Sequence, residues 1–272
     1  MKRTLIVYGN CQAGVFYHGF QARPEVSDQW DLVTMRNFIH PVDGPDKLPP
    51  DEIERCAILL EQGGPEFPYA DQLPDDCRVI RFPPLDTNLL WPLNFIDPRN
   101  KPEPPDFPFG RYPYGDRVVV ELLNEGQKGE ALWEAYQQRS IDRLPNLERL
   151  QTLEAARLAE RDLKSDTPMA PIVLEQFALQ RLFWTPNHPT GFLLGFLFGS
   201  LACALLGEDE GRRSQCLEYF MRWQPWSGAT LPIHPEVARR LGLRWHKPED
   251  EVPYNGRTLS FSEYMRSYIY WV

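Results

Sequence analysis

The sequence lacks the signatures of several large classes of protein. Its longest apolar run, residues 191–207, falls short of the roughly 20 residues that span a bilayer, so a buried helix is expected there. Lys and Arg form no dense cluster and the formal net charge is -9, which argues against a nucleic-acid partner. The Gly-x-Gly-x-x-Gly and Walker patterns are absent. No group of His, Cys and carboxylate residues has the spacing of a metal site, so no metal is expected.

Cysteine is scarce and irregularly placed. The chain has five cysteines, none of them in a Cys-x-x-Cys pair, which excludes a zinc ribbon and a regular disulfide framework. A reducing compartment fits this usage, so the predicted location is cytoplasmic. The cysteines are Cys11, Cys56, Cys77, Cys203 and Cys216.

The first third of the chain alternates short apolar runs with helical patterns. Strands are predicted over 5–8, 31–35, 57–60 and 78–82, with a helix over 11–21 after the first. The runs are nearly all apolar, as in strands covered on both faces. This pattern predicts an α/β fold that begins with a short parallel sheet of about four strands flanked by helices.

The rest of the chain is predicted to be mainly helical. Residues 83–113 form a Pro/aromatic loop of a length that is usually functional, and we expect it to lie across the sheet or line a pocket. We expect one domain over 1–272, with an α/β half, 1–115, and a mainly helical half, 116–272. Helices are predicted over 116–124, 129–139, 147–163, 172–184, 189–206 and 210–223, followed by an Asn-Gly hairpin and a capping box at Ser260 and Glu263.

The stretch "YGNCQAG", residues 8–14, carries the first candidate site. Gly9 permits a sharp turn after the first strand, and Asn10 can cap the helix that follows. Cys11 then lies among free helix amides at the carboxyl edge of the sheet, with Gln12 beside it. These amides would hold a phosphate or an oxyanion, and would lower the pKa of the thiol below roughly 8.5. The pattern indicates an activated nucleophile; the alternative is a small buried hydrophobe.

A nucleophile needs a base, and five histidines are available. His188, in "TPNHP", precedes the apolar helix and is predicted on a loop at its N-terminus. His40 follows the second strand and could also face the site. Gln62 and the Gly63-Gly64 amides follow the third strand and could complete an oxyanion hole, or form a plain turn.

A helix face and three arginines add further hypotheses. Glycine recurs every four residues over 191–199, which suits either a dimer contact or tight core packing. Arg81, Arg111 and Arg117 border the Pro/aromatic loop, where they could meet phosphate groups or simply be solvated.

Two short motifs carry a resemblance to a known family. "VYGNCQ" after the first strand and "NHP" before the apolar helix resemble the WcbI family of polysaccharide biosynthesis proteins, as do "VIRFPPLDTNLLWP" and "YGDRVVVELLNEG". The resemblance implies coenzyme A binding and sugar O-acetylation for capsular polysaccharide, with the three arginines suited to the phosphates of the coenzyme. The layout more distantly resembles GDSL-type hydrolases, in which Cys11 takes the place of the nucleophile and His188-Pro189 that of the base. Thr185 stands where that pattern has Asp.

These observations predict a coenzyme A-binding acyltransferase. It would move an acetyl group from acetyl-coenzyme A to a sugar hydroxyl in capsular or exopolysaccharide biosynthesis, with Cys11, His188 and Gln62 as catalytic residues. Gly9, Asn10, Gln12, Arg81, Arg111 and Arg117 would bind the cofactor. The alternatives are a non-catalytic module that binds coenzyme A or a phosphosugar, and an SGNH-like hydrolase of acyl esters or thioesters. The partners implied are a sugar or glycan acceptor and, through the glycine face, a second copy of the chain.

Overall fold

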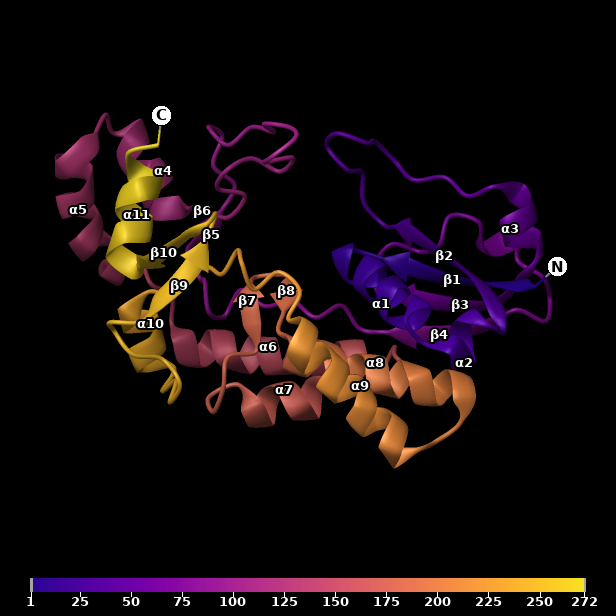
Figure 1. The fold of residues 1–272 in the computed structure, drawn as a ribbon. Coiled ribbons are helices and arrows are strands. Elements are labelled where there is room, and N and C mark those ends of the chain that lie inside the picture. The colour runs from indigo at the N-terminus through magenta and orange to yellow at the C-terminus, as the bar shows by residue number, and fades with distance from the viewer. Residues whose placement is uncertain (1, 272) are drawn as a thin grey trace. The chain divides into compact units, whose positions relative to one another are not determined.

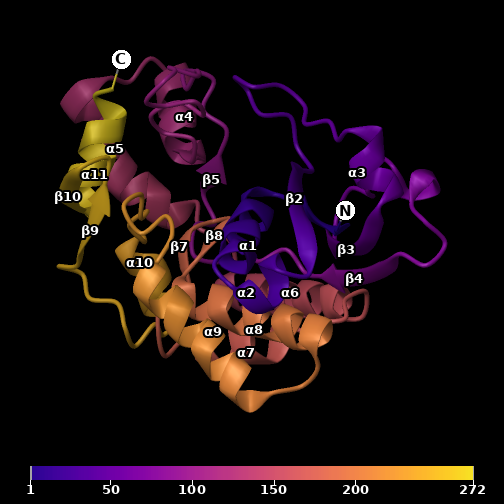
Figure 2. The same ribbon diagram turned by 45° about the vertical axis from the view of Figure 1, so that its right-hand side comes forward.

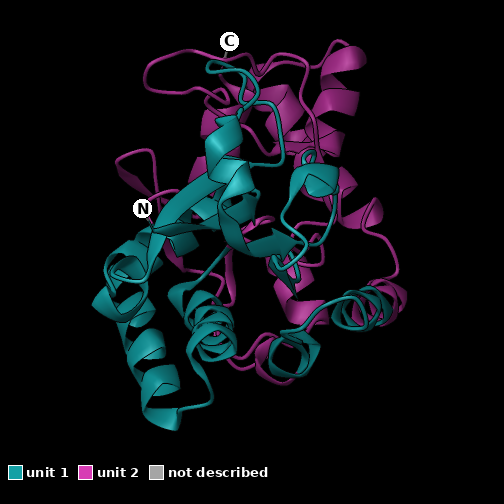
Figure 3. Ribbon diagram, turned by 90° about the vertical axis from the view of Figure 1, so that its right-hand side faces the viewer, with its two compact units in different colours: residues 1–85, 156–174, 189–225 teal, residues 86–155, 175–188, 226–272 magenta. Residues whose placement is uncertain are grey.

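The computed structural model describes residues 2–271, which form two compact units (Figures 1 and 3). Unit 1 takes residues 1–85, 156–174 and 189–225, and unit 2 takes 86–155, 175–188 and 226–272. Both units therefore combine segments from the two sides of residue 115. The single domain that the sequence suggested, with halves meeting at that residue, stays a prediction.

Unit 1 is built on a four-stranded parallel sheet, which confirms the predicted fold class. Its strands are β1 (Arg3–Gly9), β2 (Trp30–Arg36), β3 (Cys56–Gln62) and β4 (Arg78–Phe82), in the order β2-β1-β3-β4. Tyr8 of β1 pairs with Met35 on one side and Glu61 on the other. All four carboxyl ends therefore reach one edge of the sheet.

Both faces of this sheet are covered, which explains why strand β1 is buried from Thr4 to Gly9. Helix α1 (Cys11–Gln21) places Phe16 against Phe82, and both Phe16 and Phe20 against Phe198 of helix α8 (Gly191–Leu206). On the other face, Ile6 and Tyr8 belong to a buried cluster with Phe67. The sheet and its α1 side are seen in Figure 2.

The glycine face of α8 packs within unit 1. Helix α9 (Glu210–Trp223) lies alongside α8, and a Cβ added at Gly195 would stand 2.7 Å from the Cα of Leu217. A Cβ at Gly191 would collide with the carbonyl of Phe220. The face therefore serves core packing, the second of the two hypotheses, and the dimer stays a prediction.

Unit 2 packs helices around a tyrosine-rich core. Its main elements are α4 (Arg117–Asn124), α5 (Gly129–Asp142), the β9 (Glu251–Tyr254) and β10 (Arg257–Ser260) hairpin, and α11 (Phe261–Ile269). The hairpin turns at Asn255-Gly256, both with positive φ, and α11 begins with the predicted capping box. Val118, Tyr136, Tyr264 and Tyr268 lie in its buried cluster.

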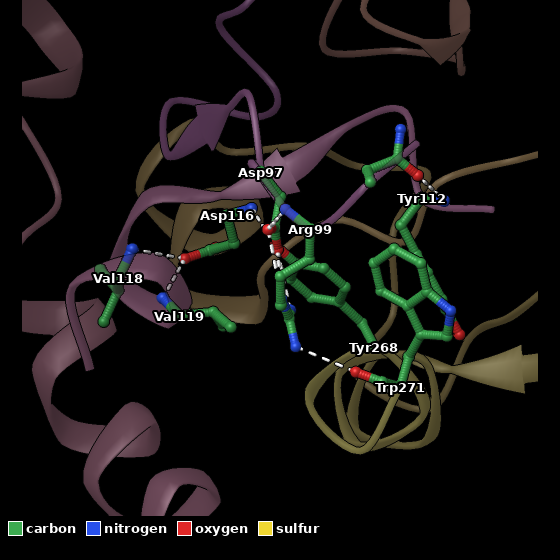
Figure 4. Close-up of polar contacts among 9 residues, drawn as sticks. Asp97, Arg99, Tyr112, Asp116, Val118, Val119, Tyr268 and Trp271 are labelled. Atoms are coloured by element: carbon green, nitrogen blue, oxygen red, sulfur yellow. Dashed lines mark hydrogen bonds and ion pairs between the residues drawn. The ribbon is translucent and has the colours of Figure 1, made fainter. Parts of the chain in front are cut away.

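A polar network is buried beneath α11 (Figure 4). Tyr268 donates its hydroxyl to Asp97 at 2.6 Å and accepts from the amide of Asp116 at 3.1 Å. Arg99 pairs with Asp97 at 2.8 Å and donates to the carbonyl of Trp271. Asp116 caps α4 and accepts from the hydroxyl of Tyr136 at 3.0 Å. The network fixes the C-terminal helix to the segment that carries Asp97.

One predicted helix is wrong in its second half. Helix α7 (Ala170–Gln176) ends early, and Phe183–Thr185 form strand β7, which pairs with β8 (His188–Pro189). The backbone of this aromatic run therefore forms its hydrogen bonds in a hairpin and not in a helix. The remaining elements are α2 (Pro24–Ser27), α3 (Pro50–Glu54), η1 (Ala70–Gln72), β5 (Asn94–Phe95), β6 (Gly115–Asp116), α6 (Leu147–Asp162) and α10 (Pro235–Arg240).

The helices of the structure can also be compared with the length and apolar character of a membrane-spanning helix. Within residues 2–271, none of the helices has both the length and the apolar character that a bilayer span requires.

Candidate functional site

Cys11 occupies the first position of α1, directly after the central strand β1. Asn10 caps the helix, because its side chain accepts a hydrogen bond from the amide of Gln12 at 2.9 Å. β1 lies between β2 and β3, so the chain passes from β1 to β2 on one side of β1 and then crosses to β3 on its other side. Ligands of open parallel sheets bind at such a switch point, at the carboxyl ends of the strands.

Buried carboxamides hold this turn in place. The amide of Asn10 donates to Gln62 Oε1 at 2.8 Å, and Gln62 Nε2 donates to Gln12 Oε1 at 3.0 Å. Gln12 Nε2 donates to the carbonyl of Leu85 at 2.7 Å, and the Leu85 amide donates back to Gln12 Oε1. Gln12 and Gln62 are only 0% and 1% exposed. The network therefore ties together the ends of β1, β3 and β4.

Gly9 is required by the same network. A Cβ at this position would lie 2.8 Å from the Cβ of Gln62, closer than side chains approach. The glycine of "YGNCQAG" thus allows Gln62 to reach the Asn10 amide.

The thiol of Cys11 is not activated in the way that the sequence suggested. Burial raises its pKa to about 11, although the amides of Cys11 and Gln12 act in the predicted direction and lower it. Desolvation outweighs the helix terminus because the surrounding side chains are neutral. The residue is nevertheless partly accessible to solvent, so its thiol is protonated but reachable.

His188 lies in β8 of the short hairpin rather than on a free loop. Its ring stacks on Trp226 with centroids 4.6 Å apart, and meets the edge of Tyr114. Burial lowers its pKa to about 4, so the imidazole is neutral near pH 7. Its Nδ1 is buried and has no hydrogen-bond partner among residues 2–271.

Neutral groups surround the position where the GDSL-type pattern has an acid. Thr185 donates its hydroxyl to Tyr114 at 3.1 Å, and Tyr114 in turn contacts the side-chain oxygen of Asn187. The hydrogen-bond partners of Thr185, Tyr114 and Asn187, are therefore both neutral. His188 and its neighbours belong to unit 2, whereas Cys11, Gln12 and Gln62 come together in unit 1.

The three predicted phosphate-binding arginines all make local contacts. Arg81 pairs with Glu61 at 3.1 Å, and Arg111 pairs with Glu103 at 2.8 Å. Arg117 lies over the ring of Phe95. Their role toward a ligand stays a prediction. His40, the second candidate base, accepts the amide of Asp43 through Nδ1 within its own turn.

Sequence reasoning missed a basic groove at the same edge of unit 1. Gly63, Gly64 and residues 82–84 form one wall, and the end of α6 forms the other, around a volume of about 390 Å³. The α6 side contributes Arg157, Arg161 and Lys164. These cations recur at intervals of four and three residues along the end of α6 and the turn that follows it, a signal that the sequence contained.

Unit 2 also encloses a cavity, but a small one. It holds about 60 Å³ and is lined mainly by apolar and tyrosine side chains, with Asp116 and His234 among them. Sites for small organic ligands usually measure roughly 300–1,000 Å³, so this cavity is too small for a sugar.

The fold and the Cys11 turn define an α/β protein with a thiol at the switch point of its parallel sheet. A family model described as polysaccharide biosynthesis enzyme WcbI matches residues 4–207, and the chain belongs to this family of enzymes.

A solved structure of WcbI, described as a novel polysaccharide biosynthesis enzyme, has the same fold. It matches with a TM-score of 0.69 and 17% identity, over 98% of this chain and 88% of that one. That structure is described as the native protein without a disulfide between coenzyme A and one of its cysteines. A search of curated proteins finds no match.

Proposed function

We propose that this protein is a coenzyme A-binding acyltransferase that moves an acetyl group to a sugar hydroxyl in capsular or exopolysaccharide biosynthesis. The observation that carries the proposal is the thiol of Cys11 on the first turn of α1, at the switch point of the sheet. Family membership supports a role in polysaccharide biosynthesis. The description of the structural neighbour relates coenzyme A to a cysteine thiol of that protein, and we propose Cys11 for this place here.

The residues present suit such a coenzyme. It carries a thiol at one end and phosphates at the other, and unit 1 offers a cysteine on an amide-rich turn as well as the basic groove. When bound, the coenzyme supplies an acyl group activated as a thioester. Gly9, Asn10 and Gln12 contribute by holding the backbone of the turn beside the thiol, where the amides of Asn10 and Gln12 themselves donate to Gln62 and to the Asn10 side chain.

The raised pKa of Cys11 argues against a pre-formed thiolate, so the proposed nucleophile needs a general base. Cys11, with a pKa of about 11, holds its proton near pH 7, whereas His188, with a pKa of about 4, is neutral there and is a weak base in this buried state. In the proposed reaction His188 would take the thiol proton as Cys11 Sγ attacks the thioester carbonyl, and would pass it to the departing coenzyme thiolate. His188 would then take the proton of the attacking sugar hydroxyl and return it to Cys11 Sγ as the acetyl group leaves the cysteine. Gln62 accepts the Asn10 amide through its buried carboxamide, so its proposed role is to hold the Cys11 turn in place.

Peptide mass spectrometry after brief incubation with acetyl-coenzyme A tests the chemical role of Cys11. We expect an acetyl group on the peptide that contains Cys11, and a loss of transfer of at least about 1,000-fold in Cys11→Ala. Cys203→Ser, a change at a buried cysteine outside the turn, serves as the matched control and should keep its activity. Full turnover in Cys11→Ala would refute the role of Cys11 as the nucleophile.

The pairing of Cys11 with His188 needs its own test, because the two residues belong to different units. His188→Gln should slow acetylation of Cys11 near pH 7. In this variant acetylation should be faster at high pH than at pH 7, because the thiol then ionises without a base. An unchanged rate and pH profile in His188→Gln would assign the base to another residue.

A non-catalytic binding module is the second candidate function. The raised pKa of Cys11 favours it, because a protonated thiol at an amide-rich turn can sit beside a ligand without reacting. In that case Cys11→Ser would bind coenzyme A as tightly as the wild type by calorimetry, and no acetyl-cysteine would form. The same two measurements therefore separate the candidates.

A further inference from the structure

Two cysteines that the acyl-transfer proposal does not use lie against each other in unit 1. The Sγ atoms of Cys56 and Cys77 are 3.5 Å apart, although the residues are 21 positions apart in the chain. Both residues are free thiols. A disulfide holds its sulfurs about 2.05 Å apart, so the two atoms need to approach by about 1.5 Å. Small side-chain rotations supply such a movement.

The register of the sheet brings these two side chains to one face. Strand β3 carries one extra residue beside β1, Ala57, between Cys56 and Ile58. Cys56 therefore shares a face with Leu59, in the buried cluster against which Cys77 packs. The two cysteines are one residue out of register between β3 and β4, so their Cα atoms lie about 6 Å apart. Disulfides span Cα separations of roughly 4.4–6.8 Å, and the backbone can stay where it is.

Arg3 holds the two cysteine-bearing segments together. Its guanidinium donates to the carbonyl of Cys56 at 2.9 Å and pairs with Asp76, the residue before Cys77, at 2.6 Å. The amide of Cys77 donates to the carbonyl of Pro74, which fixes the turn before β4. The proximity of the two sulfurs is thus supported by contacts on both sides of the pair.

The two thiols differ in exposure, which gives them different parts in an oxidation. Cys77 is partly exposed, whereas Cys56 is 0% exposed. The hydrogen bond with the Cys56 thiol lowers the pKa of Cys77, and the Arg3 guanidinium acts in the same direction. An oxidant therefore reaches Cys77 first, and Cys56 lies behind it as the resolving thiol.

We propose that Cys56 and Cys77 form a reversible disulfide when hydrogen peroxide oxidises the protein. Cys77 Sγ attacks one peroxide oxygen and the O–O bond breaks; a sulfenic acid forms, and the other oxygen leaves with the thiol proton as water. Cys56 Sγ then attacks the sulfenic sulfur and the S–O bond breaks, so that hydroxide leaves with the Cys56 proton as water. One peroxide thereby takes two electrons from two thiols, and a dithiol reductant reverses the reaction by exchange.

The disulfide constrains the sheet from the edge opposite to the candidate site. It closes a loop over residues 56–77, which contains Gln62, the residue that supports the Cys11 turn. Cys56 and Cys77 lie at the amino ends of β3 and β4, whereas Cys11 follows the carboxyl end of β1. The redox pair therefore stabilises unit 1 without occupying the proposed acyl-transfer site, and it does not depend on that function.

Peptide mapping by mass spectrometry tests the redox pair on the full chain. The protein is reduced, desalted, treated with a small excess of hydrogen peroxide, and alkylated before digestion without reductant. We expect a cross-linked peptide that joins Cys56 to Cys77, and the return of both thiols after dithiothreitol. Closure of the loop should also raise the Tm by about 5–10 °C.

Two variants separate the parts of the two thiols. In Cys56→Ser the sulfenic acid of Cys77 has no resolving partner, so it should persist and be trapped by dimedone. In Cys77→Ser the buried Cys56 should stay reduced. Cys203→Ser, a change at another buried cysteine of unit 1, is the matched control and should form the disulfide as the wild type does.

The peptide map of the wild type decides the proposal even where a variant fails to fold. If Cys56 and Cys77 both stay reduced at a peroxide dose that converts the exposed Met221 to its sulfoxide, the redox pair is wrong. A cross-link from Cys77 to Cys11 or to a second chain overturns it equally. Acetyl transfer is not part of this readout, so failure of the proposed function leaves the redox pair standing.

Discussion

Unit 1 buries neutral carboxamides at the edge of its sheet, whereas unit 2 buries carboxylates beneath its C-terminal helix. Gln12 and Gln62 hold the Cys11 turn without any charge. In unit 2 the carboxyl group of Asp97 accepts a hydrogen bond from Tyr268 of α11, and the carboxyl group of Asp116 caps α4. The difference shows that a buried hydrogen-bond network can hold a turn or a helix end in place with or without charged groups. Around Cys11 the field is weak, so burial decides the pKa of the thiol.

The carboxylates of unit 2 respond to pH in opposite directions. Burial raises the pKa of Asp97, but hydrogen bonds from Arg99 and Tyr268 outweigh it and lower the pKa below its usual value. Burial raises the pKa of Asp116 to about 6. Asp97 therefore contributes stability that is lost as the pH falls through its folded pKa. Asp116 contributes stability that is lost as the pH rises from about 4 to about 6.

Asp97→Ala should produce the largest effect, because it leaves Arg99 without its buried partner. We expect the free energy of unfolding to fall by about 3–5 kcal/mol at pH 7, measured by urea denaturation. Asp43→Ala, which breaks a more exposed pair with Arg36, is the control and should cost under about 1 kcal/mol. Equal losses in the two variants would contradict the buried role of Asp97.

Gln62→Glu would convert the neutral network into a titratable one. One carboxylate oxygen can still accept the Asn10 amide, but the other would face Gln12 Oε1, which is also an acceptor. The folded pKa of the new carboxyl should be raised, so the variant loses stability as the pH increases, by about 3 kcal/mol at pH 8 relative to pH 4. Urea unfolding at both pH values measures this slope. Gln151→Glu, at an exposed position of α6, should show little of it.

Asp116→Asn should remove a pH slope that the wild type has. Burial delays ionisation of the Asp116 carboxyl to about pH 6, whereas in the unfolded chain it ionises near pH 4, so the wild type loses about 2 kcal/mol between pH 4 and pH 7 that the variant keeps. The amide oxygen of Asn can still accept from the amides of Val118 and Val119. Parallel stability–pH curves for the variant and the wild type would show that Asp116 does not titrate in this range. Asp142→Asn, an exposed change on α5, is the control.

Gly9→Ala and Gly14→Ala should differ in sign, although the two glycines lie only five residues apart. At Gly9 the added methyl meets Gln62, and we expect a loss of about 1–2 kcal/mol together with weaker coenzyme A binding. At Gly14, inside α1, an added Cβ would meet none of the atoms of residues 2–271 that could obstruct it within 4 Å, so alanine should stabilise the helix by up to about 1 kcal/mol. Thermal melting of both variants checks this. A neutral Gly9→Ala would mean that the turn relaxes easily.

Local signals in the sequence predicted much of unit 1. The bounds of α1 and β4 agree with the structure, because an N-cap and an apolar run with turn residues beside it are encoded within a few positions. The position of Cys11 at the end of β1 followed from the same signals.

The rest depends on contacts between distant residues. Gln12 and Gln62 are 50 positions apart, and no local pattern shows that their side chains meet. The pKa of Cys11 was wrongly expected to be low, because burial is set by tertiary packing. The β7–β8 hairpin around His188 was missed for a similar reason, since its aromatic run suits a helix or a strand equally.

The interleaved course of the chain has a consequence for inheritance. The two units alternate along six segments, so five junctions separate them in the coding sequence. No single cut in the gene yields one intact unit, and a single crossover between relatives cannot exchange unit 1 while leaving unit 2 behind. The family match over residues 4–207 itself crosses four of these junctions. One crossover therefore always divides the thiol-bearing sheet, the tyrosine-rich core or both.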